Sequence, residues 1–342
     1  MATRPDICIY HSPCPDGHTA AWAVWLKWPD IKFHPAGHGN SPPDVTGLHV
    51  LIVDFSYPKH VLEKMLATAA SITILDHHKT AEASLKSLLD EGTLQGEFDM
   101  LRSGAMMAWQ YIWPEDEINP YDTEGEISDY DSDNNVWLRN GTKGHIPLLV
   151  HFIQDRDLWT WKLTDSRAVL AFAQGVEQTF EGWSQLATDL ENPDRYRQIV
   201  EIGTYLVDKQ HNDTLACIKA AQRRMDIGGY NVPVANLPYI MASDAGNIMC
   251  KGEPFAASYF DNGKGERVFS LRSDNTDPMA LDVSAIAKFY DGGGHHHASG
   301  FKMPQGWEGD PPTIEVEEVE IDDIIELPVT TILIDVTNTL NA

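Results

Sequence analysis

The chain is poor in cysteine, in long apolar runs and in positive charge, and each scarcity excludes a class of protein. Its 342 residues include only four cysteines (Cys8, Cys14, Cys217 and Cys250) without C-x-x-C spacing, which excludes a disulfide scaffold. No apolar run approaches the roughly 18 residues that span a bilayer. The first residues also lack the pattern of a signal peptide. We therefore expect a cytoplasmic protein that does not insert into a membrane.

Basic residues are outnumbered by acidic ones, 25 to 51, for a formal charge of −26. The excess is local, because residues 114–133 contain nine acids and residues 303–342 contain ten, with no Lys or Arg in either segment. The remaining 32 acids and 25 bases make a mildly acidic body. Lys and Arg supply most of the affinity for duplexes, so a long duplex is not an expected partner. A small phosphorylated ligand held by metal ions is compatible with this charge.

Strand-like and helix-like segments alternate through the first half of the chain. The apolar runs at 6–10, 49–53 and 71–75 are typical of buried parallel strands, and helical patterns follow Thr19 and Ser56. This alternation predicts an α/β fold with a doubly wound, mostly parallel sheet. We assign this domain to residues 1–191, with an exposed acidic insertion at about 114–145.

The second half of the chain has a different pattern of predicted secondary structure. Residues 192–225 carry a long helical pattern with few Gly or Pro, which predicts a helical linker. Shorter β-rich runs over 226–304 predict a smaller α+β domain, with a cleft between the two domains. Residues 305–342 form an acidic tail with a candidate β element. The hydrophobic content of 42% is sufficient for two cores.

Potential metal ligands stand where three predicted strands end. The first strand leads into His11, the second into Asp54, and the third into Asp76-His77-His78. In an open α/β sheet the carboxyl ends of the strands meet at the edge where ligands bind. Imidazole with carboxylate suits Zn or Mn better than Ca or Mg. A surface loop is the alternative for one such block, but its repetition at three strand ends favours a metal site.

Two further groups of residues allow two interpretations each. Asp155-Arg156-Asp157 follows an apolar helix-like run, and it is either a salt-bridged helix cap or part of the site. The tryptophans Trp22, Trp25 and Trp28 are either core residues or base-stacking platforms, and their spacing favours the core.

Five blocks, in order, resemble the DHH phosphoesterase family. They are His11…Pro15-Asp16-Gly17, Val53-Asp54-x-Ser56, Asp76-His77-His78, Asp155 in Asp-Arg-Asp-Leu-Trp, and Gly292-Gly293-Gly294-His295-x-x-Ala298-Ser299-Gly300. The last block is similar to the signature of the DHH-associated C-terminal domain. The resemblance covers roughly residues 6–303, and the nanoRNase/oligoribonuclease-type and pAp-phosphatase-type members are the most similar.

The resemblance implies two Mn²⁺ ions, with Mg²⁺, Co²⁺ or Zn²⁺ as alternatives. Carried over by position, His11 and Asp16 would bind the first ion, and Asp54 would bridge both ions. His77 and Asp155 would hold the second ion.

The remaining matched residues would act on the substrate. The resemblance implies that His78 faces the scissile phosphate and that Asp76 orients the imidazoles. In the C-terminal domain, Arg272, Gly293, Gly294 and His295 would bind a substrate phosphate through charge-assisted contacts and close backbone approach.

The first block departs from the family pattern. His11 precedes Asp16 by five residues instead of four, and His18 stands where a second aspartate is usual. Either His18 completes the shell of the second ion, since imidazole can replace carboxylate, or it only caps the following helix.

The resemblance implies a hydrolase that cuts short phosphorylated oligonucleotides or dinucleotides into nucleoside monophosphates with a hydroxide activated by two metal ions. The acidic insertion and tail would repel long strands. The alternatives are a pAp-type nucleotide phosphatase and a nucleotide-binding protein with weakened catalysis, the latter motivated by the altered first block. A homodimer is compatible with the sequence.

Overall fold

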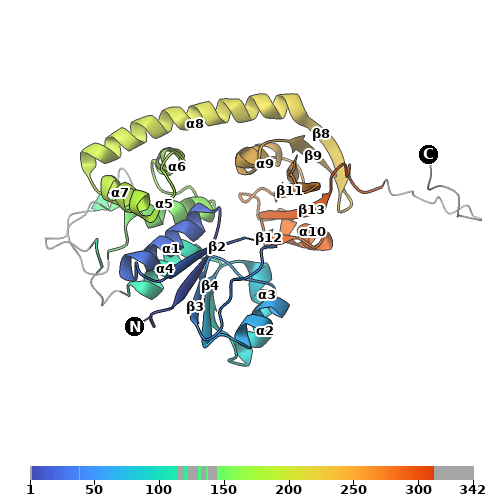
Figure 1. The fold of residues 1–342 in the computed structure, drawn as a ribbon. Helices are drawn as coiled ribbons and strands as arrows, with labels where there is room; N and C mark the ends of the chain where they lie inside the picture. Colours follow the sequence, from blue (N-terminus) through green and yellow to red (C-terminus); the bar gives the residue numbers. More distant parts are fainter. Residues whose placement is uncertain are drawn as a thin grey trace, which may run out of the picture.

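Two domains and one long connecting helix make up the described part of the chain (Figure 1). The computed structural model describes residues 2–37, 39–114, 119–121, 130–131, 136–137 and 145–311. Most of the acidic insertion and nearly all of the acidic tail therefore lie outside the described residues, as do the expectations about them. Within the described residues no helix is both long and apolar enough to cross a membrane.

The N-terminal domain is built on a sheet of five parallel strands in the order β2-β1-β3-β4-β5. The strands are β1 (Ile7–His11), β2 (Lys32–Ala36), β3 (His49–Val53), β4 (Ser71–Asp76) and β5 (Gln95–Phe98). The chain reverses its direction of travel across the sheet between β1 and β3. This switch point is where open α/β sheets bind ligands. The predicted α/β fold with a parallel sheet is confirmed.

Helices cover both faces of this sheet because alternate strand residues are apolar on both sides. Ile9 and Ile52 pack with α2 (Lys59–Leu66) and α3 (Lys79–Asp90), whereas Cys8 and Leu51 pack with α1 (Pro15–Lys27) and α4 (Gly104–Ile112). Beyond α1 and α4 lie α5 (Leu148–Asp157), α6 (Ser166–Ala173) and α7 (Phe180–Leu190). Trp22 is fully buried among these helices, which confirms its predicted place in the core. Strands β6 (Tyr130–Asp131) and β7 (Val136–Trp137) form a separate antiparallel pair.

Helix α8 (Pro193–Ala221) runs from one domain to the other (Figure 1). Its N-terminus is capped by Asn192, whose side-chain oxygen accepts hydrogen bonds from the backbone N–H groups of Asp194 and Arg195. Gly203 lets α6 approach closely, since a Cβ atom there would lie 2.0 Å from the Ala168 carbonyl oxygen. The helix ends at Ala221, so residues 222–225, which the sequence placed in the linker, begin the next strand.

The C-terminal domain contains a mixed six-stranded sheet in the order β12-β13-β11-β10-β9-β8. The strands are β8 (Gln222–Ile227), β9 (Tyr230–Asn236), β10 (Ala256–Asp261), β11 (Glu266–Arg272), β12 (Gly293–His295) and β13 (Ala298–Pro304). The 3₁₀ turn η1 (Tyr239–Met241), α9 (Ala242–Met249) and α10 (Val283–Phe289) complete the domain. This is the smaller α+β domain that the sequence predicts.

The two domains touch where α3 meets β12. The Lys79 ammonium at the start of α3 donates to Asp282, the N-cap residue of α10, over 2.8 Å. The Asn275 side-chain amide donates to the Trp159 carbonyl oxygen over 3.1 Å. These polar contacts bring the Gly-rich strand β12 against the edge of the parallel sheet.

Candidate metal centre

Asp54 stands at the middle of a buried cluster beyond the carboxyl ends of β1, β3 and β4. One of its carboxylate oxygens lies 3.3 Å from His11 Nδ1 and the other lies 3.0 Å from His77 Nε2. Its side chain is 1% exposed, and its backbone has a φ of 54°, which is uncommon for a residue other than glycine. The sheet edge therefore brings together three of the side chains that the sequence selected.

Asp16 joins the cluster from the first turn of α1. Its two oxygens accept hydrogen bonds from the backbone N–H groups of Gly104 (2.6 Å) and Ala105 (3.0 Å), the first residues of α4. A helix N-terminus stabilises negative charge, so α4 fixes this carboxylate in place. Asp16 Oδ2 then lies 3.6 Å from His77 Nε2.

Glycine is required at position 104 by the close packing of the two carboxylates. A Cβ atom there would lie 2.4 Å from the Asp54 Cβ atom and 2.9 Å from Asp16 Oδ2. Nothing in the sequence indicated this role, because a glycine that opens a helix looks like an ordinary helix start.

The structure brings Asp157, and not Asp155, to the cluster. Asp157 Oδ2 lies 3.5 Å from His77 Nε2, is buried, and accepts no hydrogen bond from the described residues. Both acids belong to the last turn of α5, and residues two apart on a helix point in different directions. Only one of them can face His77.

Asp155 stabilises the loop that follows α5. Its Oδ1 accepts hydrogen bonds from the Thr160 hydroxyl (2.5 Å) and the Lys162 N–H (2.8 Å), and its Oδ2 accepts one from the Leu163 N–H (3.2 Å). The carboxylate is thereby engaged by its own loop. The resemblance carried Asp155 into the ligand set, whereas in this structure its carboxylate faces the loop and not His77; no salt bridge of Asp155 is seen among the described residues.

The carboxylates of the cluster are buried close to one another, and this shifts the pKa values of the whole group. Burial raises the pKa of Asp16 well above its usual value, and the charges of Asp54 and Asp157 add to this effect. Burial opposes ionisation of Asp54 too, but hydrogen bonds from His11 and His77 hold its pKa well below the usual value. Burial alone would lower the pKa of His77, yet the charge of Asp157 and the Asp54 contact raise it well above normal. Such crowding of carboxylates favours a bound cation.

The cluster offers the donor atoms that a divalent transition metal prefers. Ligand atoms of Asp16, Asp54 and His77 lie within 4.8 Å of one another, and so do those of His11, Asp54 and His78. Buried Asp157 Oδ2 and His77 Nδ1 make no hydrogen bond with the described residues. Mixed imidazole and carboxylate donors fit Mn or Zn. The residues present therefore fit the implied metal ions.

His78 is oriented by Asp76. The fully buried Asp76 accepts hydrogen bonds through Oδ1 from His78 Nδ1 (2.6 Å) and the His77 N–H (2.8 Å), and through Oδ2 from the Ser56 hydroxyl (2.5 Å). Burial opposes its ionisation, but the charge and hydrogen bond of His78 lower the pKa of Asp76. With Nδ1–H donating to Asp76, the second ring nitrogen of His78 is left to act on a ligand.

The C-terminal domain contributes His295 from β12. Its ring stacks on His78 with centroids 4.6 Å apart and lies 5.0 Å from the His77 ring. Burial and the two neighbouring imidazoles lower the pKa of His295 to about 3. A neutral imidazole can still donate a hydrogen bond to an anionic phosphate, so the predicted contact of His295 with the substrate stays a prediction.

Arg272 and the glycines of β12 lie beside this contact. Arg272 donates to the Ser243 hydroxyl at 2.9 Å, and burial lowers its pKa to about 10, with the charge of Arg156 also acting to lower it. Gly293 packs on Thr80 of α3, where a Cβ atom would be 3.2 Å from the hydroxyl oxygen. Gly294 has a φ of 140°, which L side chains rarely adopt.

His18 faces away from the cluster, into an aromatic pocket. Its ring stacks on Phe180 with centroids 5.1 Å apart and meets Trp183 edge-on at 5.0 Å. Burial lowers the pKa of His18, and its buried Nε2 makes no hydrogen bond with the described residues. The structure supports neither interpretation of His18, because its ring lies among aromatic side chains and the N-cap residue of α1 is Cys14.

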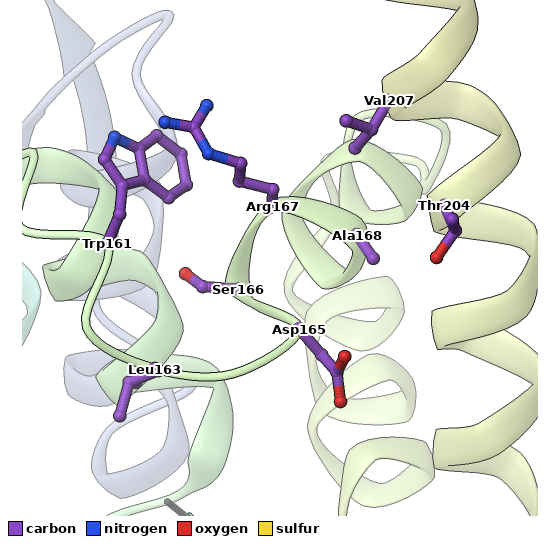
Figure 2. A pocket seen from close by; sticks show the side chains of 8 residues that line it. All are labelled: Trp161, Leu163, Asp165, Ser166, Arg167, Ala168, Thr204 and Val207. Atoms are coloured by element: carbon purple, nitrogen blue, oxygen red, sulfur yellow. The ribbon is translucent and has the colours of Figure 1, made fainter. Parts of the chain in front are cut away.

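A separate pocket of about 250 Å³ lies between α8 and the loop that leads into α6 (Figure 2). Trp161, Asp165, Ser166 and Arg167 line it on one side and Thr204 and Val207 on the other. The Arg167 guanidinium lies 4.0 Å from the Trp161 ring centroid, so the indole face is already covered. None of the predicted site residues lines this pocket.

Comparisons with known proteins give the following similarities. No family model matches the chain. An uncharacterized protein of Acanthamoeba polyphaga mimivirus is 26% identical over 340 residues, covering 92% of this chain and 70% of that protein. The solved DHH domain of a member of a family of ribosomal proteins is 16% identical, with coverage of 88% and 83% and a TM-score of 0.47. A pGpG-specific phosphodiesterase from Vibrio cholerae is 11% identical, with coverage of 87% and 93% and a TM-score of 0.42.

Proposed function

We propose that this chain is a metal-dependent phosphoesterase of the DHH family that cleaves short phosphorylated oligonucleotides or dinucleotides to nucleoside monophosphates. The observation that carries the proposal is Asp54, buried between His11 and His77 at the switch point of the parallel sheet. The five family-like blocks of the sequence supply the residues that surround it.

In this proposal the metal ligands are His11, Asp16, Asp54, His77 and Asp157. Asp157 replaces Asp155, since its buried oxygen faces His77 while Asp155 holds its own loop. Two bound Mn²⁺ ions would polarise the phosphoryl group and lower the pKa of a water molecule. Asp54 is the residue placed to serve both ions, because its two oxygens face opposite histidines.

His78 is proposed to act on the phosphate group. Asp76 holds its Nδ1–H, so Nε2 of the neutral ring can accept a proton from the attacking water, and the imidazolium so formed can then donate that proton to the leaving oxygen. Ser56 and two backbone N–H groups fix Asp76 in turn. This chain of hydrogen bonds keeps the imidazole in one orientation and one tautomer.

The C-terminal domain is proposed to hold the substrate. Arg272, Gly293, Gly294 and the neutral His295 would contact a second phosphate or the nucleotide next to the scissile bond. Backbone N–H groups at glycines can approach a phosphate closely, and Arg binds it in a bidentate manner. Bound metal ions would also offset the charge of the clustered carboxylates when an anionic substrate enters.

The test compares pApA, pAp and 5′-phosphorylated strands of 20 nucleotides with the metal-free chain, after addition of Mn²⁺, Mg²⁺ or Zn²⁺. We expect Mn²⁺-dependent release of nucleoside monophosphate from pApA, and slower cleavage of long strands at equal salt. Release of phosphate from pAp alone would support the pAp-phosphatase alternative. Tight binding of pApA without turnover, unchanged in Asp54→Asn, would support the binding-protein alternative.

A further inference from the structure

Three imidazoles meet where the two domains touch, and the proposed reaction gives them no common role. They belong to His77 and His78, directly after β4, and to His295 at the end of β12. One nitrogen of each ring lies within 4.8 Å of the corresponding nitrogens of the other two rings. The group therefore offers three ligand atoms of one kind, and the third comes from the C-terminal domain.

The spacing of the rings matches the arrangement of three imidazoles around one metal ion. The centroid of the His78 ring lies 4.6 Å from that of His295 and 4.9 Å from that of His77, and the centroids of His77 and His295 are 5.0 Å apart. Zn–N bonds of about 2.0–2.1 Å at angles near 90–110° would place the ring centroids about 4.5–5.2 Å apart. All three observed separations fall inside this range.

His78 is prepared as a ligand by its carboxylate partner. Asp76 Oδ1 accepts a hydrogen bond from His78 Nδ1 over 2.6 Å, which leaves the lone pair on Nε2. A histidine that binds zinc commonly donates its other N–H group to a carboxylate in this way. The burial of Asp76 keeps this hydrogen bond away from solvent.

The three imidazoles differ chemically from the neighbouring carboxylate cluster. Imidazoles without carboxylates suit Zn²⁺ better than Mn²⁺ or Mg²⁺, which prefer oxygen ligands. The two sites share His77, whose Nε2 lies 3.0 Å from Asp54 Oδ1. A neutral imidazole has one lone pair and one N–H group, so a single ring does not serve two ions without losing its proton. An ion at the three imidazoles therefore competes with the ions of the cluster for His77.

We propose that His77, His78 and His295 together form a Zn²⁺ site that inhibits the protein. The bound ion would occupy His78 Nε2, withdraw His77 from the cluster and tie β12 to the N-terminal domain. Three protein ligands would leave the fourth position of a tetrahedral ion to water. The existence of the site does not depend on the reaction, whereas the inhibition rests on the proposed function.

The test is equilibrium dialysis of the full chain against Zn²⁺ with Mn²⁺ in excess, followed by X-ray absorption at the zinc edge to count the imidazole ligands. We expect one tightly bound Zn²⁺ with three imidazoles in the wild type. His295→Gln removes a direct ligand, so it should lower the affinity for Zn²⁺ at least ~10-fold and reduce the count by one imidazole. The matched control His296→Gln, one position further along the chain, should change neither quantity. Zn²⁺ bound mainly by carboxylate oxygens, or with unchanged affinity in His295→Gln, would overturn the site.

A second assay measures the inhibition. Zn²⁺ should slow pApA cleavage by the Mn²⁺-loaded chain, excess Mn²⁺ should restore it, and His295→Gln should need at least ~10-fold more Zn²⁺ for half-inhibition. Equal sensitivity of the wild type and His295→Gln to Zn²⁺ would overturn the inhibitory role. A wild-type chain that does not cleave pApA would refute the proposed function, and the dialysis would still decide whether the Zn²⁺ site exists.

Discussion

Asp54 is the residue on which the candidate site depends most. Each oxygen faces a different histidine, so an amide at this position would leave one side with a donor where an acceptor is needed. We expect Asp54→Asn to lower kcat by more than the ~100-fold that changes around metal ligands typically cost. Activity assays with Mn²⁺, together with bound metal measured on the purified variant, check this. A variant that keeps wild-type metal content and turnover would contradict it.

The two acids of α5 give the sharpest residue-scale comparison. Asp157→Asn should abolish the stabilisation that saturating Mn²⁺ confers, about 2.7 kcal/mol when the ion exceeds its Kd 100-fold. Asp155→Asn should instead lower the stability of the metal-free chain by ~1.5–3 kcal/mol, because the amide NH₂ that replaces one carboxylate oxygen cannot accept the loop hydrogen bond made there.

Thermal unfolding of both variants with and without Mn²⁺ separates the two roles. If Asp155→Asn loses the response to Mn²⁺ and Asp157→Asn retains it, the residue-by-residue transfer from the sequence blocks is right and the assignment of Asp157 is wrong. The two variants carry the same chemical change two positions apart, so each is the control for the other.

At the scale of elements, the first turn of α4 holds two carboxylates of the cluster in position. Its first two N–H groups hold Asp16, and Gly104 leaves room for Asp54. In an ordinary helix Gly→Ala stabilises by about 0.5–1 kcal/mol. Here we expect Gly104→Ala to separate the two carboxylates and lower Mn²⁺ affinity at least ~10-fold, which metal titration followed by calorimetry measures.

Gly203 of α8 supplies the matched control for this prediction. A Cβ atom there would also clash, 2.0 Å from the Ala168 carbonyl oxygen, but on α6 and away from the cluster. Gly203→Ala should therefore cost ~1–3 kcal/mol of stability by overpacking and leave Mn²⁺ affinity unchanged. Equal loss of metal affinity in both variants would mean that general destabilisation explains the effect of Gly104→Ala.

The elements also explain what the sequence could and could not predict. Strand ends were predictable, because apolar runs that stop at His11, Asp54 and Asp76 are local features of the chain. The orientation of α5 was not, since residues two apart on a helix differ by about 200° and only the packing of α5 decides which one faces His77. The orientation of His18 was unpredictable for the same reason, because α1 directs Asp16 to the cluster and His18 toward Phe180.

At the scale of the whole molecule, the pattern of helix-like and strand-like segments predicted two domains and their order along the chain. It did not predict how the two domains contact each other. Neither Lys79 nor Asp282 belongs to a family-like block, and they lie 203 residues apart in sequence. The stacking of His295 on His78 likewise follows from how the domains dock. Contacts between residues far apart in the sequence depend on tertiary packing, and local sequence patterns carry no information about it.

The Lys79–Asp282 ion pair should set how firmly the domains close on the substrate. It joins the residue after His78 to the N-cap of α10, and both side chains are partly exposed, so its effect is small. We expect Lys79→Met and Asp282→Asn each to raise KM for pApA about threefold, and the double variant to be no worse than either single one. Lys86→Met, which breaks the Lys86–Asp90 pair within α3, should leave KM unchanged.

The pH dependence of this effect follows from Asp282. Burial opposes its ionisation, but hydrogen bonds from Lys79 and Ser284 lower its pKa to about 2. Because the pKa of Asp282 is lower in the folded chain, the ion pair contributes fully to domain closure above the unfolded pKa near 4. This contribution is lost as the pH falls toward 2. The threefold effect on KM should therefore be constant between about pH 6 and pH 8, well above both values. Additive effects of the two single substitutions, or an equal effect of Lys86→Met, would show that the ion pair does not couple the domains.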